Sequence, residues 1–536
     1  MEKVWLKHYP SGVPAEIDGS RYTSLVEILE ASFRTYAERP AFECLGRALS
    51  YRELDVLSRR VAAWFQAQGL ERGATVALMM PNVTPYPICV AAILRAGYTV
   101  VNVNPLYTPR ELEYQLKDSG AVALFILEGF LPVFQKIQAN TAVRHVVTVA
   151  AGAPGTASPG VVPFERVLSE GEALTFAPVP VAPDDIAFLQ YTGGTTGVVK
   201  GAMLLHRNLI ASLLQTAAWL RPALGEREGQ PLTFVCALPL YHIYALNNCA
   251  LLGLYLGVTN ILIPNPRDIT GLIQALAHRP IHALPGVNTF FNALIHHPDL
   301  GKLDLSQLLI VNGGGAAAQR TVAEKWFALT GVPIIQSYGL TEASPGVSCN
   351  PVTDTEFSDS IGLPLPSTEV SLRDDAGREV PLGEAGEICV RGPQVMAGYW
   401  KRPEETAGVM TSEGFLKTGD IGFMDARGYL RIVDRKKDMI LVSGFNVYPN
   451  EVEGVVAMHP GVLEVAVVGV PDAHSGEAVK VFVVKKDPSL TETQLLDFCR
   501  EQLTGYKRPK SIEFRAELPK SSVGKILRRE LRPQSS

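Results

Sequence analysis

Several features are missing from this sequence of 536 residues, and each absence argues against a class of protein. The seven cysteines are scattered and form no C-x-x-C pair, so neither a disulfide framework nor a zinc site is indicated. No uninterrupted apolar run approaches the roughly 18–20 residues that span a bilayer, and Met1–Pro10 carries no apolar signal core. We find no internal repeat. The net charge of −5 gives no sign of nucleic-acid binding. These absences predict a soluble, cytoplasmic protein.

The composition that remains is that of a well-packed globular protein with more than one core. Apolar residues make up 47% of the chain and charged residues 19%, which argues against disorder. A single core stops growing at roughly 250–300 residues, so several domains are expected. From Glu501 onward, nine Lys or Arg stand against four Glu. This basic end is either a solvated tail or a surface that meets phosphates or an anionic membrane.

Strand and helix patterns alternate through the first half of the chain. Capping boxes that begin at Ser24 and Ser50 open two amphipathic helices. The run Thr75–Met80 predicts a buried strand, Tyr86–Arg95 a helix and Tyr98–Val103 the next strand. Such alternation indicates βαβ units and a largely parallel sheet with helices on its faces.

The second half of the chain shows a different pattern of predicted secondary structure. Short strands broken by Gly and Pro fill Pro364–Gly398, which predicts a β-rich subdomain. Two strand patterns, Val462–Val470 and Val479–Lys485, precede a helix opened by the box at Thr491, and the charged run Asp434–Asp438 is predicted to be an exposed linker before them. The predicted fold class is α/β. A large N-terminal domain, residues 1–434, combines parallel βαβ sheets with the β-rich subdomain, and a small mobile α+β domain follows at residues 435–536.

The most informative stretch is Tyr191–Gly201, which reads YTGGTTGVVKG. It follows a strand pattern at Ile186–Gln190 and precedes a helix pattern at Asn208–Leu220. Glycines let a backbone approach a polyphosphate closely, while threonine hydroxyls, amide N–H groups and Lys200 bind phosphate oxygens. It is not a Walker A loop, because that loop requires Ser or Thr after its lysine. A generic glycine-rich turn needs no lysine, so we interpret the stretch as a phosphate-binding loop.

This loop resembles the phosphate-binding signature of adenylate-forming enzymes, which include acyl-CoA synthetases, firefly luciferases and the adenylation domains of peptide synthetases. Three further segments resemble motifs of that family in the same order: QSYGLTE at Gln336–Glu342, LKTGD at Leu416–Asp420 followed by Asp434-Arg435, and PKSSVGKILRR at Pro519–Arg529. Each segment alone would be a surface turn or a solvated tail. Together they extend the resemblance over essentially the whole chain.

The resemblance implies roles for individual residues. Tyr338 would stack on adenine, Thr341 would bond the α-phosphate, and Glu342 would hold Mg²⁺. Asp420 would accept from both ribose hydroxyls, and Lys525 would contact the acyl carboxylate and the α-phosphate. The implied catalytic residues are Lys525, Lys200, Glu342 and Thr341. The implied ATP- and AMP-binding set is Thr192, Gly193, Gly194, Thr195, Thr196, Gly197, Lys200, Gly313, Gly314, Gly315, Gln336, Tyr338, Gly339, Thr341, Asp420, Arg435 and Lys525.

Within the family the sequence is most similar to the bacterial long-chain fatty-acid–CoA ligases. The segments that carry this similarity are Asp434–Glu451, Gln502–Lys507, Leu238–His242 and Gly286–Thr289. It implies that Lys437 is the hinge about which the C-terminal domain rotates between two half-reactions. The acyl and coenzyme A pocket so implied consists of His242, Gly286, Ser443, Gly444, Phe445 and Asn446.

Three features of the sequence leave the identity of the acyl substrate open. His242 has about equal claim to be a satisfied core histidine. Many relatives carry Lys and Gln where this chain has Leu441 and Asn446, and the segment Val149–Pro183 is short and rich in Pro, Ala and Gly. The preferred acyl chain length therefore stays open.

The predicted function is ATP-dependent activation of a long- or medium-chain fatty acid to acyl-AMP, then thioesterification to acyl-CoA with release of AMP and pyrophosphate. Mg²⁺ is the predicted cofactor, and ATP and coenzyme A are co-substrates. One alternative is an aryl- or luciferase-type adenylating enzyme. Another is a fatty-acid-binding or signalling protein without catalysis, which the joint presence of Lys200, Glu342, Asp420, Arg435 and Lys525 opposes. No nucleic-acid partner is expected. A homodimer and peripheral contact with the inner face of a membrane, through basic patches or Trp5–Tyr9, stay open.

Overall fold

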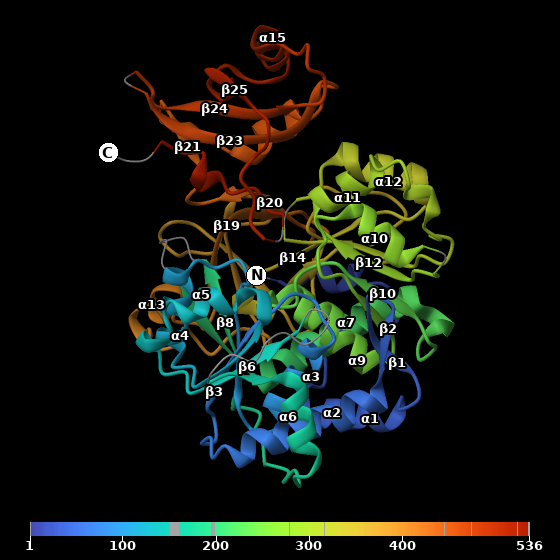
Figure 1. Ribbon diagram of the computed structural model, residues 1–536. Helices are drawn as coiled ribbons and strands as arrows, with labels where there is room; N and C mark the ends of the chain where they lie inside the picture. The colour runs from blue at the N-terminus through green and yellow to red at the C-terminus, as the bar shows by residue number, and fades with distance from the viewer. Residues whose placement is uncertain are drawn as a thin grey trace.

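The computed structural model describes residues 2–150, 160–193, 199–277, 279–315, 317–443, 445–472, 474–522 and 524–533. Over these residues four sheets carry the fold. Figure 1 shows a large body beneath a smaller C-terminal lobe that holds β23, β24, β25 and α15. The predicted α/β class, with parallel sheets, a β-rich part and a C-terminal α+β domain, is confirmed.

The first large sheet has seven strands in the order β7-β6-β5-β3-β4-β8-β9. All neighbouring pairs are parallel except β8 with β9. The strands are β3 Thr75–Met79, β4 Thr99–Asn102, β5 Ala123–Leu127, β6 His145–Val149, β7 Val162–Pro163, β8 Ile186–Gly193 and β9 Val199–Leu205.

Ser50 and Glu53 form the predicted capping box of helix α2, Tyr51–Ala67. The Ser50 Oγ accepts the Glu53 N–H at 3.1 Å, and Glu53 Oε2 accepts the Ser50 N–H at 2.7 Å.

The second large sheet has nine strands in the order β16-β15-β14-β13-β12-β10-β11-β1-β2. Its central pairs are parallel, and antiparallel pairs close both edges. The strands are β1 Pro40–Cys44, β2 Arg47–Ser50, β10 Thr233–Cys236, β11 Thr259–Leu262, β12 Ala283–Gly286, β13 Ile310–Gly313, β14 Ile335–Gly339, β15 Gly346–Cys349 and β16 Leu363–Pro364.

Helices pack on these two sheets and bury amphipathic faces, as the spacing of apolar residues predicts. A π-helical segment, Leu246–Leu251, joins α8 to α9. The helices of the body are α1 Leu25–Thr35, α2 Tyr51–Ala67, α3 Pro85–Arg95, α4 Pro109–Ser119, α5 Leu131–Gln135, α6 Phe164–Glu172, α7 His206–Leu224, α8 Ile243–Ala245, α9 Leu252–Leu256, α10 Ile269–Leu276, α11 Asn288–Ile295, α12 Arg320–Thr330 and α13 Pro403–Val409.

One strand was missed by the sequence analysis. The glycine-rich loop was predicted to lead from a strand towards a helix, but β9 lies between the loop and α7. Strand β9 pairs antiparallel with β8, from Gly193 opposite Val199 to Ile186 opposite Leu205. The glycine-rich loop therefore connects the two arms of a hairpin. Val199–Leu205 (VKGAMLL) has no regular polar and apolar alternation that would indicate a strand. Gly201 faces the Tyr191 ring, whose atoms would lie 3.1 Å from a Cβ at that position.

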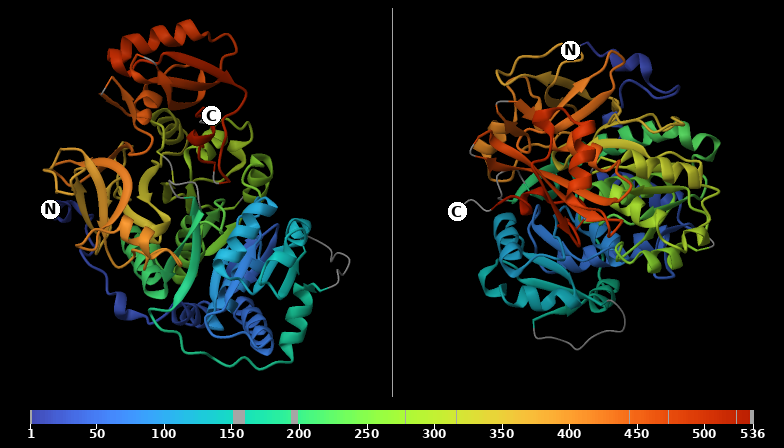
Figure 2. Two further views of the ribbon diagram at one scale, coloured as in Figure 1. Left: turned by 90° about the vertical axis from the view of Figure 1, so that its left-hand side faces the viewer. Right: turned by 90° about the horizontal axis from the view of Figure 1, so that it is seen from above.

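The predicted β-rich subdomain is present as a four-stranded antiparallel sheet, but it extends beyond the predicted Pro364–Gly398. Its strands are β17 Glu369–Arg373, β18 Gly386–Arg391, β19 Leu416–Met424 and β20 Leu430–Arg435. Figure 2 shows the N-terminal segment beside it. The short helix Val4–His8 contributes the buried Trp5, which packs so closely on Gly428 that a Cβ there would lie 2.5 Å from the tryptophan.

The C-terminal lobe is a five-stranded sheet in the order β22-β21-β24-β23, with β25 parallel to β24. The capping box at Thr491 and the strands around it are confirmed. Its elements are β21 Ile440–Val442, β22 Phe445–Val447, α14 Pro449–Val456, β23 Val462–Asp472, β24 Gly476–Lys485, α15 Glu492–Gln502 and β25 Ser511–Arg515.

The prediction that Asp434–Asp438 is an exposed linker is wrong for its two ends. Asp434 is 0% exposed and Asp438 is 9% exposed, while Lys436 and Lys437 between them are exposed. Both carboxylates are buried because they pair with arginines of the C-terminal segment, Arg528 and Arg532. No helix in the described part of the chain is long and apolar enough to cross a membrane.

Candidate active site

The glycine-rich loop predicted to bind phosphate begins at the end of β8 with Thr192 and Gly193, and Lys200 follows it on β9. Gly194, Thr195, Thr196 and Gly197 lie outside the described residues. The side chain of Lys200 is 11% exposed and forms an ion pair with Glu405 of α13. Its Nζ also lies 5.2 Å from the centroid of the Tyr399 ring.

The segment 396–405 joins this loop to the second signature. Tyr399 Oη donates to Glu342 Oε1 at 2.7 Å. The Met396 N–H donates to the Glu342 carbonyl at 2.8 Å, and the Trp400 N–H donates to the Gly201 carbonyl at 2.7 Å. Lys200 and Glu342, which are far apart in sequence, therefore both contact one tyrosine, Lys200 at its ring and Glu342 at its hydroxyl.

A hydroxyl, a carboxylate and a guanidinium meet at the third signature. Tyr338, on β14, donates to Asp420 Oδ2 at 2.6 Å, and Arg435 Nε lies 3.3 Å from Asp420 Oδ1. Asp420 and Arg435 stand directly opposite each other on β19 and β20, which fixes their pairing through the sheet register. Burial and the Asp420 carboxylate raise the pKa of Tyr338 well above its usual value, so its phenol stays protonated.

The glycine turn after β13 is tightly constrained. A Cβ on Gly314 would lie 3.0 Å from the ring of Tyr244, and Gly315 has φ of +76°, which favours glycine. Gly313 ends β13 against Ile334, and a Cβ on Gly339 would lie 2.1 Å from the Pro345 carbonyl oxygen. Packing therefore disfavours a side chain at Gly313, Gly314 and Gly339, and the backbone conformation favours glycine at position 315.

Gln336 uses its amide to shape the same turn. Its Oε1 accepts the Ala318 N–H at 2.9 Å, and its Nε2 donates to the Ser358 carbonyl at 2.6 Å. The side chain thus braces two loops around β14. Thr341 opens the short helix Thr341–Ala343 that carries Glu342.

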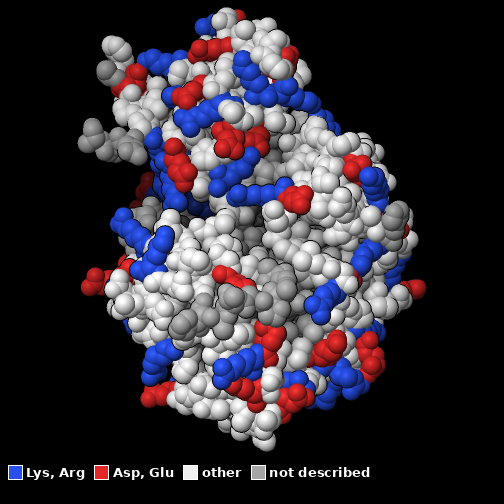
Figure 3. All heavy atoms as spheres, in the orientation of Figure 1, with Lys and Arg blue, Asp and Glu red and all other residues white. Residues whose placement is uncertain are grey.

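The C-terminal loop brings Lys525 to this cluster. The Thr289 hydroxyl, on α11, donates to the Gly524 carbonyl at 3.2 Å, and His242 Nε2 lies 3.4 Å from Ser522 Oγ. Lys525 is half-buried, and burial together with the nearby Arg435 lowers its pKa to about 8, although Asp420 opposes the shift. Figure 3 shows a hollow where the C-terminal lobe meets the body, with Lys and Arg side chains gathered above it.

The residues implied for the acyl and coenzyme A pocket fall into two groups. His242 and Gly286 lie in the body, and burial lowers the pKa of His242 to about 4, so its imidazole is neutral. Ser443, Phe445 and Asn446 belong to the β21–β22 hairpin of the lobe, and Gly444 lies outside the described residues. Phe445 is 56% exposed and stacks on Tyr506 of the lobe at 4.9 Å. The structure therefore places Lys525 near Asp420 and Arg435, while the described residues of this hairpin contact the lobe.

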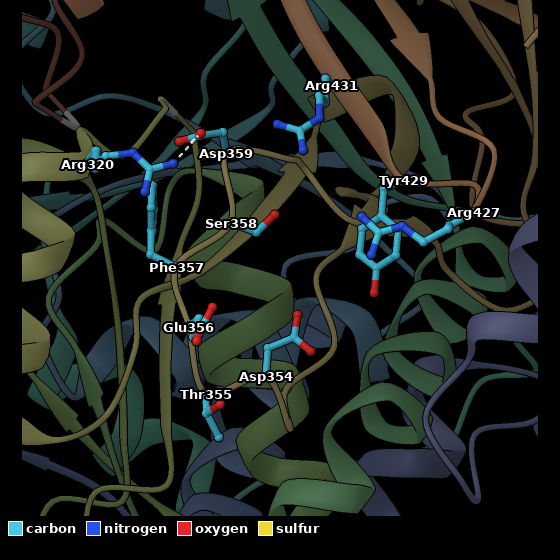
Figure 4. Close-up of a pocket in the computed structure, with 10 residues that line it drawn as sticks. All are labelled: Arg320, Asp354, Thr355, Glu356, Phe357, Ser358, Asp359, Arg427, Tyr429 and Arg431. Atoms are coloured by element: carbon cyan, nitrogen blue, oxygen red, sulfur yellow. Dashed lines mark hydrogen bonds and ion pairs between the residues drawn. The ribbon is translucent and has the colours of Figure 1, made fainter. Parts of the chain in front are cut away.

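A separate surface pocket of about 420 Å³ lies where the loop 354–359 meets α12 and β20. Figure 4 shows Arg320, Arg427 and Arg431 around it together with Asp354, Glu356 and Asp359, and Arg320 pairs with Asp359. Its charges balance, and it includes none of the residues that the signatures implied.

The sequence did not indicate that four residues belong to the site: Tyr399, Glu405, Ser522 and Thr289. Tyr399 and Glu405 lie outside the signatures, and only the fold reveals that segment 396–405 bridges two of them. Ser522 and Thr289 stand inside segments already singled out, but their contacts join residues more than 230 positions apart in sequence, which no local spacing can indicate.

Comparison with known proteins gives a consistent result along the chain. The family model described as AMP-binding enzyme matches residues 29–400, and that of the AMP-binding enzyme C-terminal domain matches residues 451–525. A long-chain-fatty-acid–CoA ligase from Escherichia coli O6:H1 is 54% identical over 557 aligned positions, which cover 100% of this chain and 99% of the relative.

Solved structures agree. An anthranilate CoA ligase in complex with anthranoyl-AMP superposes with a TM-score of 0.87 at 27% identity, covering 96% of this chain and 98% of the other. An o-succinylbenzoate coenzyme A synthetase from Bacillus subtilis, in complex with ATP and magnesium ion, gives a TM-score of 0.78 at 28% identity, covering 94% and 98%.

Proposed function

Because this chain belongs to the AMP-binding enzyme family, we propose that it activates a long- or medium-chain fatty acid with ATP and transfers the acyl group to coenzyme A. AMP and pyrophosphate are the other products. The observation that carries the proposal is the full-length 54% identity to a ligase of that name. The position of Lys525, near enough to Asp420 and Arg435 for their charges to affect its pKa, supports it.

In the first half-reaction the fatty-acid carboxylate attacks the α-phosphorus of ATP and expels pyrophosphate. Negative charge builds up on the phosphate oxygens as the fifth bond forms. The ammonium groups of Lys200 and Lys525 offset that charge from two sides, which lowers the barrier. Lys200 must leave Glu405 to do so, so the ion pair seen here is exchanged for a pair with phosphate.

The adenosine is held by residues already gathered in the fold. Asp420 accepts from the ribose hydroxyls next to Arg435, and the Tyr338 ring offers its face to adenine. The glycine turn at Gly313–Gly315 would line the base, since Gly314 lies against Ser337, the neighbour of Tyr338.

The candidate position for Mg²⁺ is Glu342. Its Oε1 accepts from Tyr399, and among the described residues Oε2 makes no hydrogen bond or ion pair, which makes Oε2 the candidate ligand atom. One protein carboxylate completed by phosphate oxygens and waters suits Mg²⁺. The ion would neutralise polyphosphate charge when ATP is bound.

Replacing Glu342 with alanine tests this assignment. The expected result is a loss of ATP–pyrophosphate exchange of about 100-fold, because removing one charged ligand costs several kcal/mol of charge stabilisation. Glu356→Ala, which alters a surface carboxylate of the separate pocket, is the matched control. Exchange at the wild-type rate in Glu342→Ala with saturating Mg²⁺ would refute the assignment.

In the second half-reaction the coenzyme A thiolate attacks the acyl carbonyl and displaces AMP. Coenzyme A supplies its own sulfur, so no cysteine of the enzyme is needed as nucleophile. The lobe must then turn about Lys437, since the hairpin with Ser443, Phe445 and Asn446 has to reach the carbonyl that Lys525 leaves. We retain the division into residues 1–434 and 435–536 as part of this proposal.

The test of the function is AMP release from ATP in the presence of coenzyme A and one acid at a time. Saturated fatty acids from short to long chain are compared with cinnamates and benzoates. We expect the highest kcat/KM among medium or long chains. A higher kcat/KM for the aromatic acids would overturn the proposal in favour of an aryl-adenylating enzyme, and no AMP release with any acid would favour a protein without catalysis.

A further inference from the structure

Arg528 lies three residues after Lys525 and contacts residues on both sides of the hinge. Its Nε and Nη2 lie 2.9 and 2.7 Å from the two carboxylate oxygens of Glu453, and its Nη2 also donates to Asn450. Its Nη1 donates to Asp434 Oδ1 at 3.1 Å and lies 3.6 Å from Asp438. The side chain is only 15% exposed. One guanidinium thus faces three carboxylates in a poorly solvated place.

Asp434 belongs to the body. It pairs with Ile421 in the β19–β20 ladder of the four-stranded sheet. The next residues follow the same sheet, because the Lys436 N–H donates to the Gly419 carbonyl at 3.0 Å and Lys436 Nζ lies 3.4 Å from Glu387. Up to Lys436 the chain is therefore attached to β18 and β19.

Glu453, Asn450 and Asp438 belong to the lobe. Asn450 and Glu453 lie on α14, and the Glu453 Oε1 also accepts the Val467 N–H of β23 at 2.8 Å. Asp438 pairs with Arg532 at 2.8 Å. When the lobe turns about Lys437, the contacts within the lobe stay, but Arg528 separates from Asp434. The turn also separates the Asn450 N–H from Asp434 Oδ2, now 2.8 Å apart.

From this arrangement we propose that Arg528 is a positioning residue: its bond to Asp434 holds the lobe in the orientation that presents Lys525 to the nucleotide site. The inference deepens the proposed function and rests on it. Asp434 is 0% exposed, so it loses its charged partner without gaining water at the start of the turn. The bond therefore favours the orientation for the first half-reaction over that for the second.

The charge cluster offers a matched pair of variants. Asp434→Asn weakens the contact that crosses the hinge, and Glu453→Gln weakens a contact of the same guanidinium that stays within the lobe. Each variant is measured in single-turnover acyl-adenylate formation and in thioester formation from supplied acyl-adenylate and coenzyme A. A merely structural role for the cluster changes both rates alike.

For Asp434→Asn we expect adenylate formation to slow by about tenfold or more while thioester formation holds or rises, since coupling energies of this kind shift equilibria about 5- to 150-fold. Glu453→Gln should leave the ratio of the two rates within about twofold of wild type. Arg528→Ala should behave like Asp434→Asn, and Arg528→Lys should recover part of the ratio. A ratio in Asp434→Asn equal to that of Glu453→Gln overturns the proposal.

A second readout does not depend on the reaction. Lys436 and Lys437 offer trypsin two sites in the linker. Cleavage tracks the population of the opened form, so we expect it to be faster when the lobe leaves its docked orientation more often. Cleavage should be faster in Asp434→Asn than in Glu453→Gln, and equal rates contradict the proposed bond. If wild type releases no AMP with any acid, the proposed function fails, while the cleavage comparison still decides the role of Arg528.

Discussion

The body and the C-terminal lobe differ in what holds each together and in what joins them. Each has its own apolar cores: two clusters contain only lobe residues, from Ile440 to Leu531, and the other four contain only body residues up to Ile432. Outside the linker, the hydrogen bonds between described residues of the body and the lobe include His242 with Ser522, Thr289 with Gly524, and Asp434 with Arg528 and Asn450.

This difference has a physical consequence. Separating an apolar interface costs about 25 cal/mol per Å² exposed, whereas exposed or part-buried polar contacts can be exchanged for water at little net cost. A lobe that has its own apolar core and is attached through hydrogen bonds can therefore change orientation without unfolding. The buried Asp434–Arg528 pair is the exception, because its charges are poorly solvated.

The largest effect that tests this comparison is the loss of Lys525. Lys525→Ala should lower acyl-adenylate formation by roughly 100- to 1,000-fold, since it removes a charge aimed at the transition state. Thioester formation from supplied acyl-adenylate should stay within a few-fold of wild type. Lys520→Ala, which breaks a 2.6 Å pair with Glu464 inside the lobe, is the control and should affect neither step strongly. Equal loss of both steps in folded Lys525→Ala contradicts a role in adenylation only.

The next effect comes from restricting the hinge. Lys437→Pro fixes φ near roughly −65° and should stop the lobe from turning. If the docked orientation survives, adenylate forms at a rate near that of wild type and thioester formation falls by about tenfold or more, which is opposite to Lys525→Ala. Rapid-quench measurement of both half-reactions decides the point. Full overall activity in Lys437→Pro excludes rotation about this residue.

The sequence was informative wherever a local pattern carries the chemistry. The capping boxes at Ser50 and Thr491 predict helices that form as expected, because the bonds join residues three positions apart. The resemblance selects Tyr338, Asp420 and Arg435, and the fold does bring them together. Their roles towards a nucleotide stay predictions.

What the sequence could not provide depends on distant pairing. A run of charge at Asp434–Asp438 favours exposure until Arg528, ninety-four positions from Asp434, is known to lie against it. Likewise the position of Tyr399 between Lys200 and Glu342 follows from strand β9, which was not predicted, and from the bond of Trp400 to Gly201. Local spacing contains neither fact.

A smaller effect should appear in the pH dependence. Lys525 must be protonated to offset phosphate charge, and its pKa of about 8 in the folded protein means that kcat/KM for adenylation should fall about tenfold per unit above pH 8. Stability responds in the other direction. A solvated lysine has a pKa of 10.5, so between pH 8 and 10.5 the unfolded chain binds more protons and this group makes folding more favourable as pH rises.

The opposite signs make this measurement decisive. A fall in adenylation above pH 8 with no fall in thermal stability identifies the titration of a site residue. Thioester formation from supplied acyl-adenylate should show no such fall above pH 8. In Lys525→Arg the fall in adenylation should move to higher pH, because arginine stays charged. A fall at the same pH in Lys525→Arg assigns the titration to another group.

The smallest expected effect concerns the cysteines, and it separates direct transfer to coenzyme A from a covalent thioester on the enzyme. All seven are buried, in both body and lobe. Burial raises the pKa of Cys44 and Cys499 to about 11 and that of Cys349 and Cys389 to about 12, so these thiols are weak nucleophiles at neutral pH.

Cys349 is the sharpest case, because its Sγ lies 3.9 Å from Asn312 Nδ2 beside the glycine turn, whereas Cys499 lies on α15 in the lobe. Cys349→Ala and Cys499→Ala should both keep kcat within a few-fold and lose about 1 kcal/mol of stability from the small cavity. AMP release and thermal unfolding are measured on each. Loss of turnover in folded Cys349→Ala but not in Cys499→Ala, with acyl-thioester trapped on the wild-type enzyme, would show that the acyl group passes through the protein.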